Sequence, residues 1–154
     1  MDAVTRQGTG MQVGDSSSLD RAILEQIADA VVYADASGTI TLWNAAAGAL
    51  FGYSVAEAVG QSLNLIIPEH LQKAHWRAFE AAMTTGVMRL QGRPTLTRAK
   101  HQSGRKLYVE MTFALVRQPG GTARGAVAVA RDVTERIERQ RDGSSASSAP
   151  PVPR

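Results

Sequence analysis

Three turn sequences, each flanked by short β-branched runs, place the strongest constraint on how this chain can fold. They are Asp35-Ala-Ser-Gly38, Gln102-Ser-Gly104 and Pro119-Gly-Gly121. Residues of these types favour tight turns between neighbouring antiparallel strands. The sequence therefore predicts one hairpin ahead of residue 45 and three further antiparallel strands after residue 92.

Helix signals fill the segment between the hairpin and those three strands. Asn44 is expected to cap a short Ala-rich helix, and Ser54 followed by Glu57 forms a capping box for a second one. A longer amphipathic helix is expected to begin near Pro68 and to run to about Thr84. This order of elements predicts the α+β class, as a five-stranded antiparallel sheet with helices packed on one face.

The predicted elements divide the chain into four parts. Residues 1–18 and 143–154 are polar and rich in small residues without an apolar period, so we expect both ends to be disordered. Residues 19–132 should form one domain that opens with a short helix, and residues 133–142 should form a charged exit helix. A single domain is also expected from 154 residues with 44% hydrophobic and 20% charged residues.

Several function classes are disfavoured by what the sequence lacks. It contains no cysteine, which removes disulfides, thiolate metal sites and cysteine nucleophiles. It has no Gly-rich phosphate loop, HExxH motif or GxSxG motif, so we do not expect an enzyme. Because no apolar run is long enough to cross a bilayer or to act as a secretory signal, we expect a cytoplasmic protein without membrane contact.

A basic segment lies between Val87 and Lys106. It carries six Arg or Lys residues and no Asp or Glu. A solvated strand-and-turn surface accounts for this charge, because no helix-turn-helix or zinc signature accompanies it and Tyr108 is its only aromatic neighbour. We therefore do not expect nucleic acid as a partner.

The long helix carries a histidine on its apolar side. Counting helical turns from His75 gives Leu71, Ala78, Phe79 and Ala82 as its neighbours on one stripe. A neutral imidazole in such a place either packs in the core or binds a metal through its free nitrogen. The residues alone leave these two interpretations open.

Segments between Leu24 and Arg141 resemble the PAS family of small sensor domains. They are IADAVVYADASGTITLWNAAAGALFGY, EAVGQSLNLIIP, the hairpin turn at Gly104, and ARDVTER. The last of these is similar to the family's exit motif, here Asp132 to Glu135. The resemblance implies a domain that holds a ligand or a partner and passes a signal out through this exit.

The resemblance extends to the haem-binding, oxygen-sensing members of the family. Their iron ligand is a histidine on the long helix shortly after an Ile-Pro or Met-Pro pair, and His75 follows such a pair here. The resemblance thus implies haem b with its iron on His75, and O₂, CO or NO as the sensed gas. It also implies Arg93, on the next strand, as the distal residue, and Arg89 is a candidate propionate partner. The expected apolar contacts are Leu71, Ala78, Phe79, Leu96, Met111, Phe113 and Val127.

Two alternatives stay open beside haem. One is a flavin or another small molecule, with Trp43 and Asn44 as candidate lining residues; cysteinyl-adduct flavin chemistry is excluded because the chain has no cysteine. The other is a ligand-free module that acts by pairing with a partner. Ala81 stands where some haem-binding relatives carry a propionate-binding arginine. For all of these functions we expect a homodimer and a separate signalling effector protein.

Overall fold

An antiparallel sheet of five strands lies at the centre of the computed structural model, which describes residues 13–146. The strand order across the sheet is β2-β1-β5-β4-β3, and every neighbouring pair is antiparallel. The strands are β1 (Ala30–Asp35), β2 (Ile40–Trp43), β3 (Thr95–Lys100), β4 (Lys106–Arg117) and β5 (Ala123–Asp132). The predicted hairpin and the three later strands are all present.

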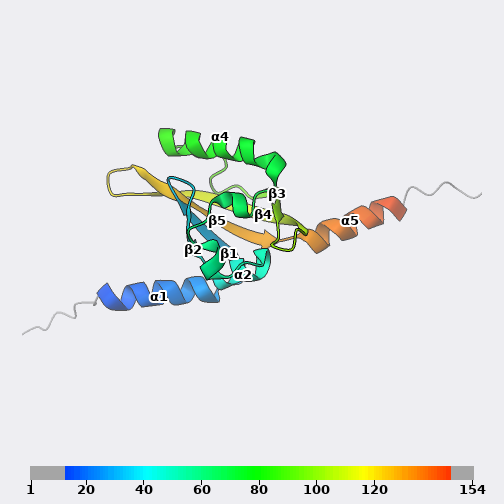
Figure 1. Cartoon of the computed structure of the whole chain (residues 1–154), viewed down its shortest axis with the longest axis horizontal. Helices are drawn as coiled ribbons and strands as arrows, with labels where there is room; N and C mark the ends of the chain where they lie inside the picture. The colour runs from blue at the N-terminus through cyan, green and yellow to red at the C-terminus, as the bar shows by residue number, and fades with distance from the viewer. Residues whose placement is uncertain (1–12, 147–154) are drawn as a thin grey trace, which may run out of the picture.

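Helices occupy the connection between β2 and β3 and both ends of the described chain. They are α1 (Val13–Gln26), α2 (Ala45–Phe51), α3 (Val55–Ala58), α4 (Glu69–Thr85) and α5 (Thr134–Ala146), with a short 3-10 helix, η1 (Leu63–Leu65). Figure 1 shows α4 lying along the sheet, while α1 and α5 extend from the domain in opposite directions. The predicted α+β class, a five-stranded antiparallel sheet with helices packed on one face, is confirmed.

Strand alternation divides the sheet into an inner and an outer face. The ladders align Val32 of β1, Ala128 of β5 and Phe113 of β4 on one side, and they align Met111 with Ala130 on the same side. This inner face packs against side chains from α2, α3 and η1 in one hydrophobic cluster. The largest fully buried apolar side chains of this core are Phe51, Ile40, Leu107 and Val109. Burying a side chain of this kind contributes about 1.5–3 kcal/mol.

Asn44 joins three elements through its side chain. Its Oδ1 accepts the backbone N–H groups of Val31 and Ala47, both at 2.9 Å. Its Nδ2 donates to the carbonyls of Leu24 at 2.8 Å and of Asp29 at 3.1 Å. These four bonds use the whole hydrogen-bonding capacity of an amide that is 1% exposed. The predicted helix cap is confirmed, and the same side chain also ties the end of α1 to β1.

Two further helix signals are confirmed. Ser54 Oγ accepts the N–H of Glu57, and the Glu57 carboxylate accepts the N–H of Ser54. Helix α4 begins at Glu69 and ends at Thr85, where Gly86 adopts the left-handed conformation at φ 69°. The long helix therefore ends within one residue of the predicted position.

The two ends of the described chain are more helical than we predict from sequence. Residues 13–18 belong to α1, and residues 143–146 continue α5. The structure differs from the predicted disorder there because residues 13–18 and 143–146 are mostly small or polar and give no apolar period from which a helix could be predicted. Residues 1–12 and 147–154, the rest of the predicted disordered ends, lie outside the described residues.

Candidate functional site

His75 lies on the side of α4 that turns toward the protein interior. It shares that side with Phe79 and Ala82, which are both buried. The imidazole is half-buried, and its centroid lies 5.9 Å from that of the Phe79 ring with the two planes 27° apart. The ring of Trp76 meets it edge-on at 4.9 Å and 82°. His75 is therefore on the apolar side of the helix, as the periodicity predicts.

One nitrogen of the His75 ring has no partner. Its Nδ1 is buried and makes no hydrogen bond to any residue that the structure describes. Burial lowers the pKa of His75 below its ordinary value, so the ring is neutral at pH 7. A buried polar atom without a partner costs about 1–3 kcal/mol. This ring therefore has the protonation state and the unmet bonding capacity of a ligand-binding histidine.

The inner face of the sheet carries two of the predicted apolar contacts. Met111 is 9% exposed, and Phe113 is partly buried against the core cluster. Their neighbours across the ladder are the small residues Ala130 and Ala128. On α4, Leu71 is half-buried. Met111 and Phe113 thus lie on the inner face of the sheet, and all three of these side chains are at least partly buried.

Leu96 and Val127 do not lie on that face. Leu96 pairs with Glu110 and Val127 pairs with Ala114, so both lie on the outer face of the sheet, opposite to Met111. Leu96 is 52% exposed. The prediction is wrong because apolar residues occupy both faces of these strands, and a shift of one residue in the count moves a side chain to the other face.

Ala78 is also placed differently from the prediction. It is exposed, whereas Ala82 is buried. The buried arc of α4 is centred between His75 and Phe79, and Ala78 lies outside that arc. The apolar stripe read from the sequence is wider than the surface that the helix buries, because alanine is small and does not report burial.

Arg93 and Arg89 lie on the connection between α4 and β3, and both are exposed. Arg93 comes two residues before β3 begins, so its predicted place on the strand is wrong. The connection is held against β4, because the N–H of Gly92 donates to the carbonyl of Phe113 at 3.2 Å and Gln91 forms a β-bridge with the same residue. Arg93 therefore projects from a segment fixed beside an inner-face residue.

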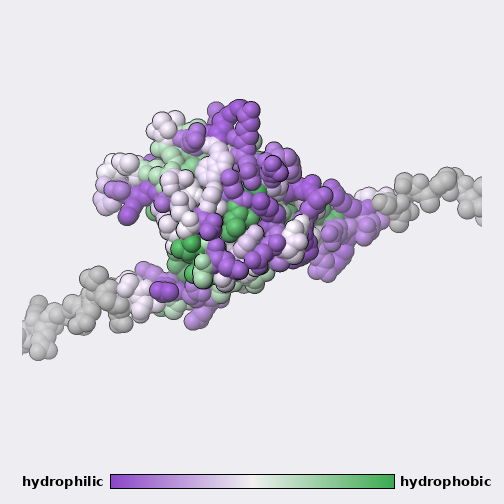
Figure 2. Space-filling model, viewed as in Figure 1, coloured by the Kyte–Doolittle hydropathy of each residue, from purple (hydrophilic) through white to green (hydrophobic). Residues whose placement is uncertain are grey.

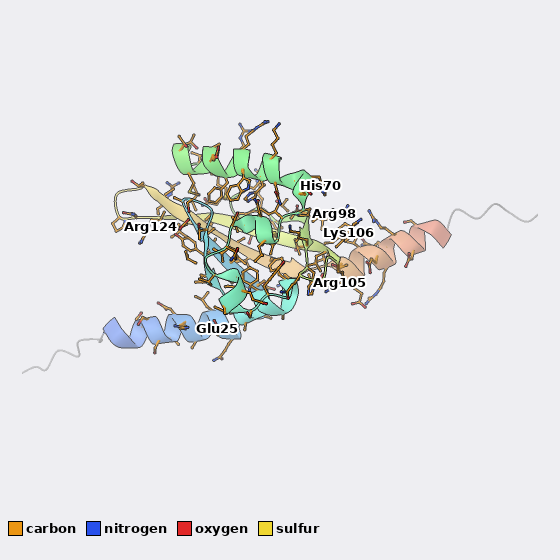
Figure 3. The ribbon with its side chains drawn as sticks, in the orientation of Figure 1. Glu25, His70, Arg98, Arg105, Lys106 and Arg124 are labelled. Atoms are coloured by element: carbon orange, nitrogen blue, oxygen red, sulfur yellow. The ribbon has the colours of Figure 1, made fainter. Side chains whose placement is uncertain are left out.

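The other two histidines occupy polar positions. His70 is exposed in the first turn of α4, where Figure 3 labels it. His101 lies at the β3–β4 turn with its Nδ1 3.0 Å from Ser103 Oγ. Within residues 13–146 no group of three or more His, Asp or Glu side chains could hold a metal ion. A metal at His75 would therefore have to bring its other ligands with it, as haem iron does.

The two candidate flavin-lining residues have structural partners. The indole N–H of Trp43 donates to the carbonyl of Tyr53 at 3.0 Å, and the Trp43 ring packs 5.4 Å from that of Phe51. The amide of Asn44 is fully used in the four bonds described above. Neither side chain has polar capacity to offer a ligand.

The exit motif fixes the start of α5 to the sheet. Asp132 Oδ1 accepts the N–H of Thr134, and Thr134 Oγ1 accepts the N–H of Tyr108, both at 2.9 Å. The guanidinium groups of Arg98 and Arg141 lie over the Tyr108 ring at 5.4 and 5.2 Å from its centroid. Tyr108 thus contacts α5 at its first residue and again two turns later. No local pattern predicts this role, and its one signal in the sequence is an aromatic residue beside a basic segment.

Asp29 and Arg131 form an ion pair that the sequence does not predict. The two residues are 102 positions apart, and nothing in their local patterns indicates that they meet. Two shallow surface depressions flank this pair, and neither is lined by His75.

In the part of the chain that the structure describes, no helix has the length and apolar character to span a bilayer.

The family of the chain follows from comparison with known sequences. A family model described as PAS fold matches residues 18–133. The chain therefore belongs to the PAS family, and the domain described above is a PAS sensor domain. The resemblance to the PAS family is confirmed.

Two curated relatives share about a third of their aligned residues with this chain. The sensor protein FixL of Bradyrhizobium diazoefficiens is 32% identical over 120 residues, which are 78% of this chain and 23% of the relative. An uncharacterized protein of Azorhizobium caulinodans is 31% identical over 139 residues, which are 90% of this chain and 18% of the relative. The chain thus spans less than a quarter of the length of either relative.

Solved structures share the fold. The PAS domain of a protein from Colwellia psychrerythraea gives a TM-score of 0.68 at 23% identity, over 79% of this chain and 99% of that one. An RNA-binding Light-Oxygen-Voltage receptor gives 0.67 at 21% identity, over 96% of this chain and 42% of that one. At these identities the likeness supports the PAS fold alone.

Proposed function

We propose that this PAS domain binds haem b through His75 and senses a diatomic gas, O₂, CO or NO. The observation that carries the proposal is the half-buried, neutral imidazole on α4 whose Nδ1 has no hydrogen-bond partner among the described residues. Haem held by His75 would supply an iron centre to which such a gas can bind. The match to a protein named as a sensor supports a sensory role.

Side chains on two sides of the candidate site would hold the cofactor. From α4, His75 would bind the iron and Phe79 and Leu71 would contact the ring; from β4, Met111 and Phe113 would face it. Apart from His75, these side chains are apolar and at least partly buried. Such a lining would suit a flat aromatic group and would keep water from its iron.

Arginines on the α4–β3 connection would supply the polar contacts. Arg93 would donate a charge-assisted hydrogen bond to a bound gas, and Arg89 would pair with a propionate. Both are exposed in the structure, and no ion pair occupies either of them among the described residues. Each is therefore available for a carboxylate or for a bound gas.

The signal would leave through the Asp132–Glu135 exit to a separate effector protein, without catalysis by this domain. The contacts of Tyr108 with Thr134 and Arg141 support this route, because they join a strand of the sheet to the exit helix. Such a signal requires two arrangements of the sheet and the exit helix in equilibrium. A gas shifts the balance between them only if it binds one arrangement more tightly than the other.

The test is the visible spectrum of the protein expressed with a haem precursor. The unaltered protein should show a Soret band, and His75→Ala should lose it. His70→Ala is the matched control, because it removes an exposed histidine from the same helix, and it should keep the band. A folded but colourless unaltered protein would overturn the haem proposal.

An apolar stripe along α1 and the residue that follows it favours a second function, the pairing of two copies of the domain. Leu19, Ile23 and Ile27 recur at every fourth position and are 59%, 51% and 37% exposed. In Figure 2 hydrophobic residues reach the surface beside the end of α1, whereas the surface of α5 is largely hydrophilic. Exposed apolar surface of this kind marks protein contacts. With haem bound, such a homodimer would be a gas sensor. Without haem, it would be a ligand-free module that acts through the pairing itself.

Light scattering across a range of protein concentrations tests the pairing. Ile23→Glu should shift the protein from dimer to monomer, because it places a charge in the stripe. Arg21→Glu, an exposed change two residues away along α1, should leave the dimer in place. A monomer at every concentration in the unaltered protein would exclude this function.

A further inference from the structure

Trp76 fastens α4 to the β1–β2 turn and to η1. Its indole N–H donates to Asn64 Oδ1 at 2.7 Å. Its six-membered ring lies on Gly38, where a Cβ would come within 2.2 Å of the Trp76 Cη2 atom. The turn can therefore accept this ring only because residue 38 has no side chain.

The surface on which Trp76 rests is a single hydrogen-bonded unit. Gly38 donates its N–H to the carbonyl of Asp35 at 2.9 Å and accepts the N–H of Leu63 at 3.1 Å. Thr39 forms a β-bridge with Ser62, whose Oγ accepts the N–H of Asn64 at 3.2 Å. The turn and η1 thus hold each other, and together they present one docking place for the indole.

Trp76 also contacts the two rings that define the candidate site. Its centroid lies 4.9 Å from that of His75 and 5.5 Å from that of Phe79, with interplanar angles of 82° and 78°. Successive residues of an α-helix point about 100° apart around its axis. Fixing the direction of Trp76 therefore fixes the rotation of α4 about its axis and the direction in which His75 points.

We propose that Trp76 is the positioning residue of His75. It sets the rotation of α4 through Gly38 and Asn64, and so decides where the imidazole presents its free nitrogen. It also connects the β1–β2 turn to any displacement of His75. The part that concerns haem rests on the function proposed above, whereas the anchoring of α4 does not.

The test compares two tryptophan variants. Trp76→Phe keeps an aromatic ring on this side of α4 but loses both the N–H bond to Asn64 and the outer ring edge that reaches Gly38. Trp43→Phe is the matched control, because it loses one indole N–H bond, to the Tyr53 carbonyl, at a place away from α4. Asn64→Leu removes the acceptor of the same hydrogen bond. It replaces Trp76→Phe in the test if that variant does not fold.

In the haem-loaded protein, the iron–histidine stretching band in the resonance Raman spectrum reports how His75 is held. We expect Trp76→Phe and Asn64→Leu to shift or broaden this band and to speed haem loss about ten-fold, the factor that one hydrogen bond can supply. Trp43→Phe should leave the band where it is, even if it lowers the melting temperature. An unchanged band in Trp76→Phe, or an equal change in Trp43→Phe, would overturn the proposal.

Hydrogen exchange of the haem-free protein separates this inference from the haem proposal. The amides of α4 should exchange faster in Trp76→Phe than in Trp43→Phe, because only the former frees the helix from its docking place. Equal exchange in the two variants would overturn the anchoring role. If neither the variants nor the unaltered protein shows a Soret band, the haem function is wrong. Hydrogen exchange in the haem-free protein then decides the anchoring role by itself.

Discussion

Arg131 forms a bidentate ion pair with Asp29, because its Nε and Nη2 each donate a 2.9 Å hydrogen bond to a different oxygen of the carboxylate. Asp29 directly precedes β1, and Arg131 is the penultimate residue of β5. The pair therefore joins the place where the chain enters the sheet to the place where it leaves.

This ion pair should contribute little stability, and only above acidic pH. The hydrogen bond from Arg131 lowers the pKa of Asp29, so the contribution is present above the ordinary aspartate pKa of about 3.9 and is lost as pH falls through the lowered value. The side chains are 67% and 31% exposed, so solvent screens the attraction. Urea unfolding should show a small loss in Asp29→Asn at neutral pH and none at about pH 2. An equal loss at both would contradict the electrostatic origin.

The burial of His75 should make the haem-free protein less stable in mild acid. Because burial lowers the pKa of this ring in the folded state, the unfolded chain binds the proton more readily. Unfolding free energy should therefore fall as pH drops below the ordinary histidine value of about 6.5, and should be level above it as far as this group is concerned. Urea titrations at several pH values should show a weaker fall in His75→Gln than in the unaltered protein. His70→Gln is the control, and a similar change in both variants would rule out His75 as the source.

Removing the Asn44 side chain should be among the most damaging single changes. Asn44→Ala leaves the N–H groups of Val31 and Ala47 and two carbonyls without their partner in a buried place. We expect a loss of about 2–4 kcal/mol in unfolding free energy. Ser54→Ala, which removes an exposed helix cap, should cost about 1 kcal/mol. Comparable losses in the two variants would show that the links to α1 and β1 carry no stability.

The contact between Gly38 and Trp76 can be measured against a glycine of the same conformation. Gly38 and Gly104 have φ angles of 81° and 84°, but no atom lies within 4 Å of the place where a Cβ on Gly104 would stand. Gly104→Ala should therefore cost only the left-handed conformation, about 1–2 kcal/mol. Gly38→Ala adds the overlap with the indole and should cost about 1–3 kcal/mol more. Chemical denaturation gives both values, and equal losses would mean that the ring moves aside freely.

Arg93 should discriminate between gases if it serves the haem. Arg93→Ala should weaken O₂ binding about ten-fold and CO binding far less, because the polar iron–oxygen unit gains more from a charged donor. Gas titrations followed in the visible spectrum give both affinities. Arg124→Ala, an exposed arginine near the β4–β5 turn in Figure 3, is the control and should change neither affinity. Equal losses for the two gases in Arg93→Ala would remove it from the distal role.

Local signals in the sequence predicted most of the fold. Asn44, Ser54 and Gly86 mark helix ends through their own side chain or backbone, and the turns ending at Gly104 and Gly121 mark strand ends in the same way. Such signals depend on neighbours within a few residues, so they can be read without knowing the tertiary structure.

The face of a strand residue and the partner of a surface charge could not be read in this way. Leu96 and Val127 are apolar but lie on the outer face, because apolar side chains occupy both sides of β3 and β5. Asp29 meets Arg131 only because β1 and β5 are adjacent in the folded sheet. For His75, periodicity placed the ring on the correct side of α4, but only the folded structure shows that its Nδ1 has no partner among residues 13–146 and that the Trp76 indole packs beside it.

Tyr108 holds the exit helix at two points, with its backbone at Thr134 and its ring at Arg141. Because a single residue of β4 provides both points, we expect the helix to move together with that strand as one rigid element. A slight tilt of β4 would be magnified along its length, so whatever is joined to the far end of α5 would be displaced further than the strand itself.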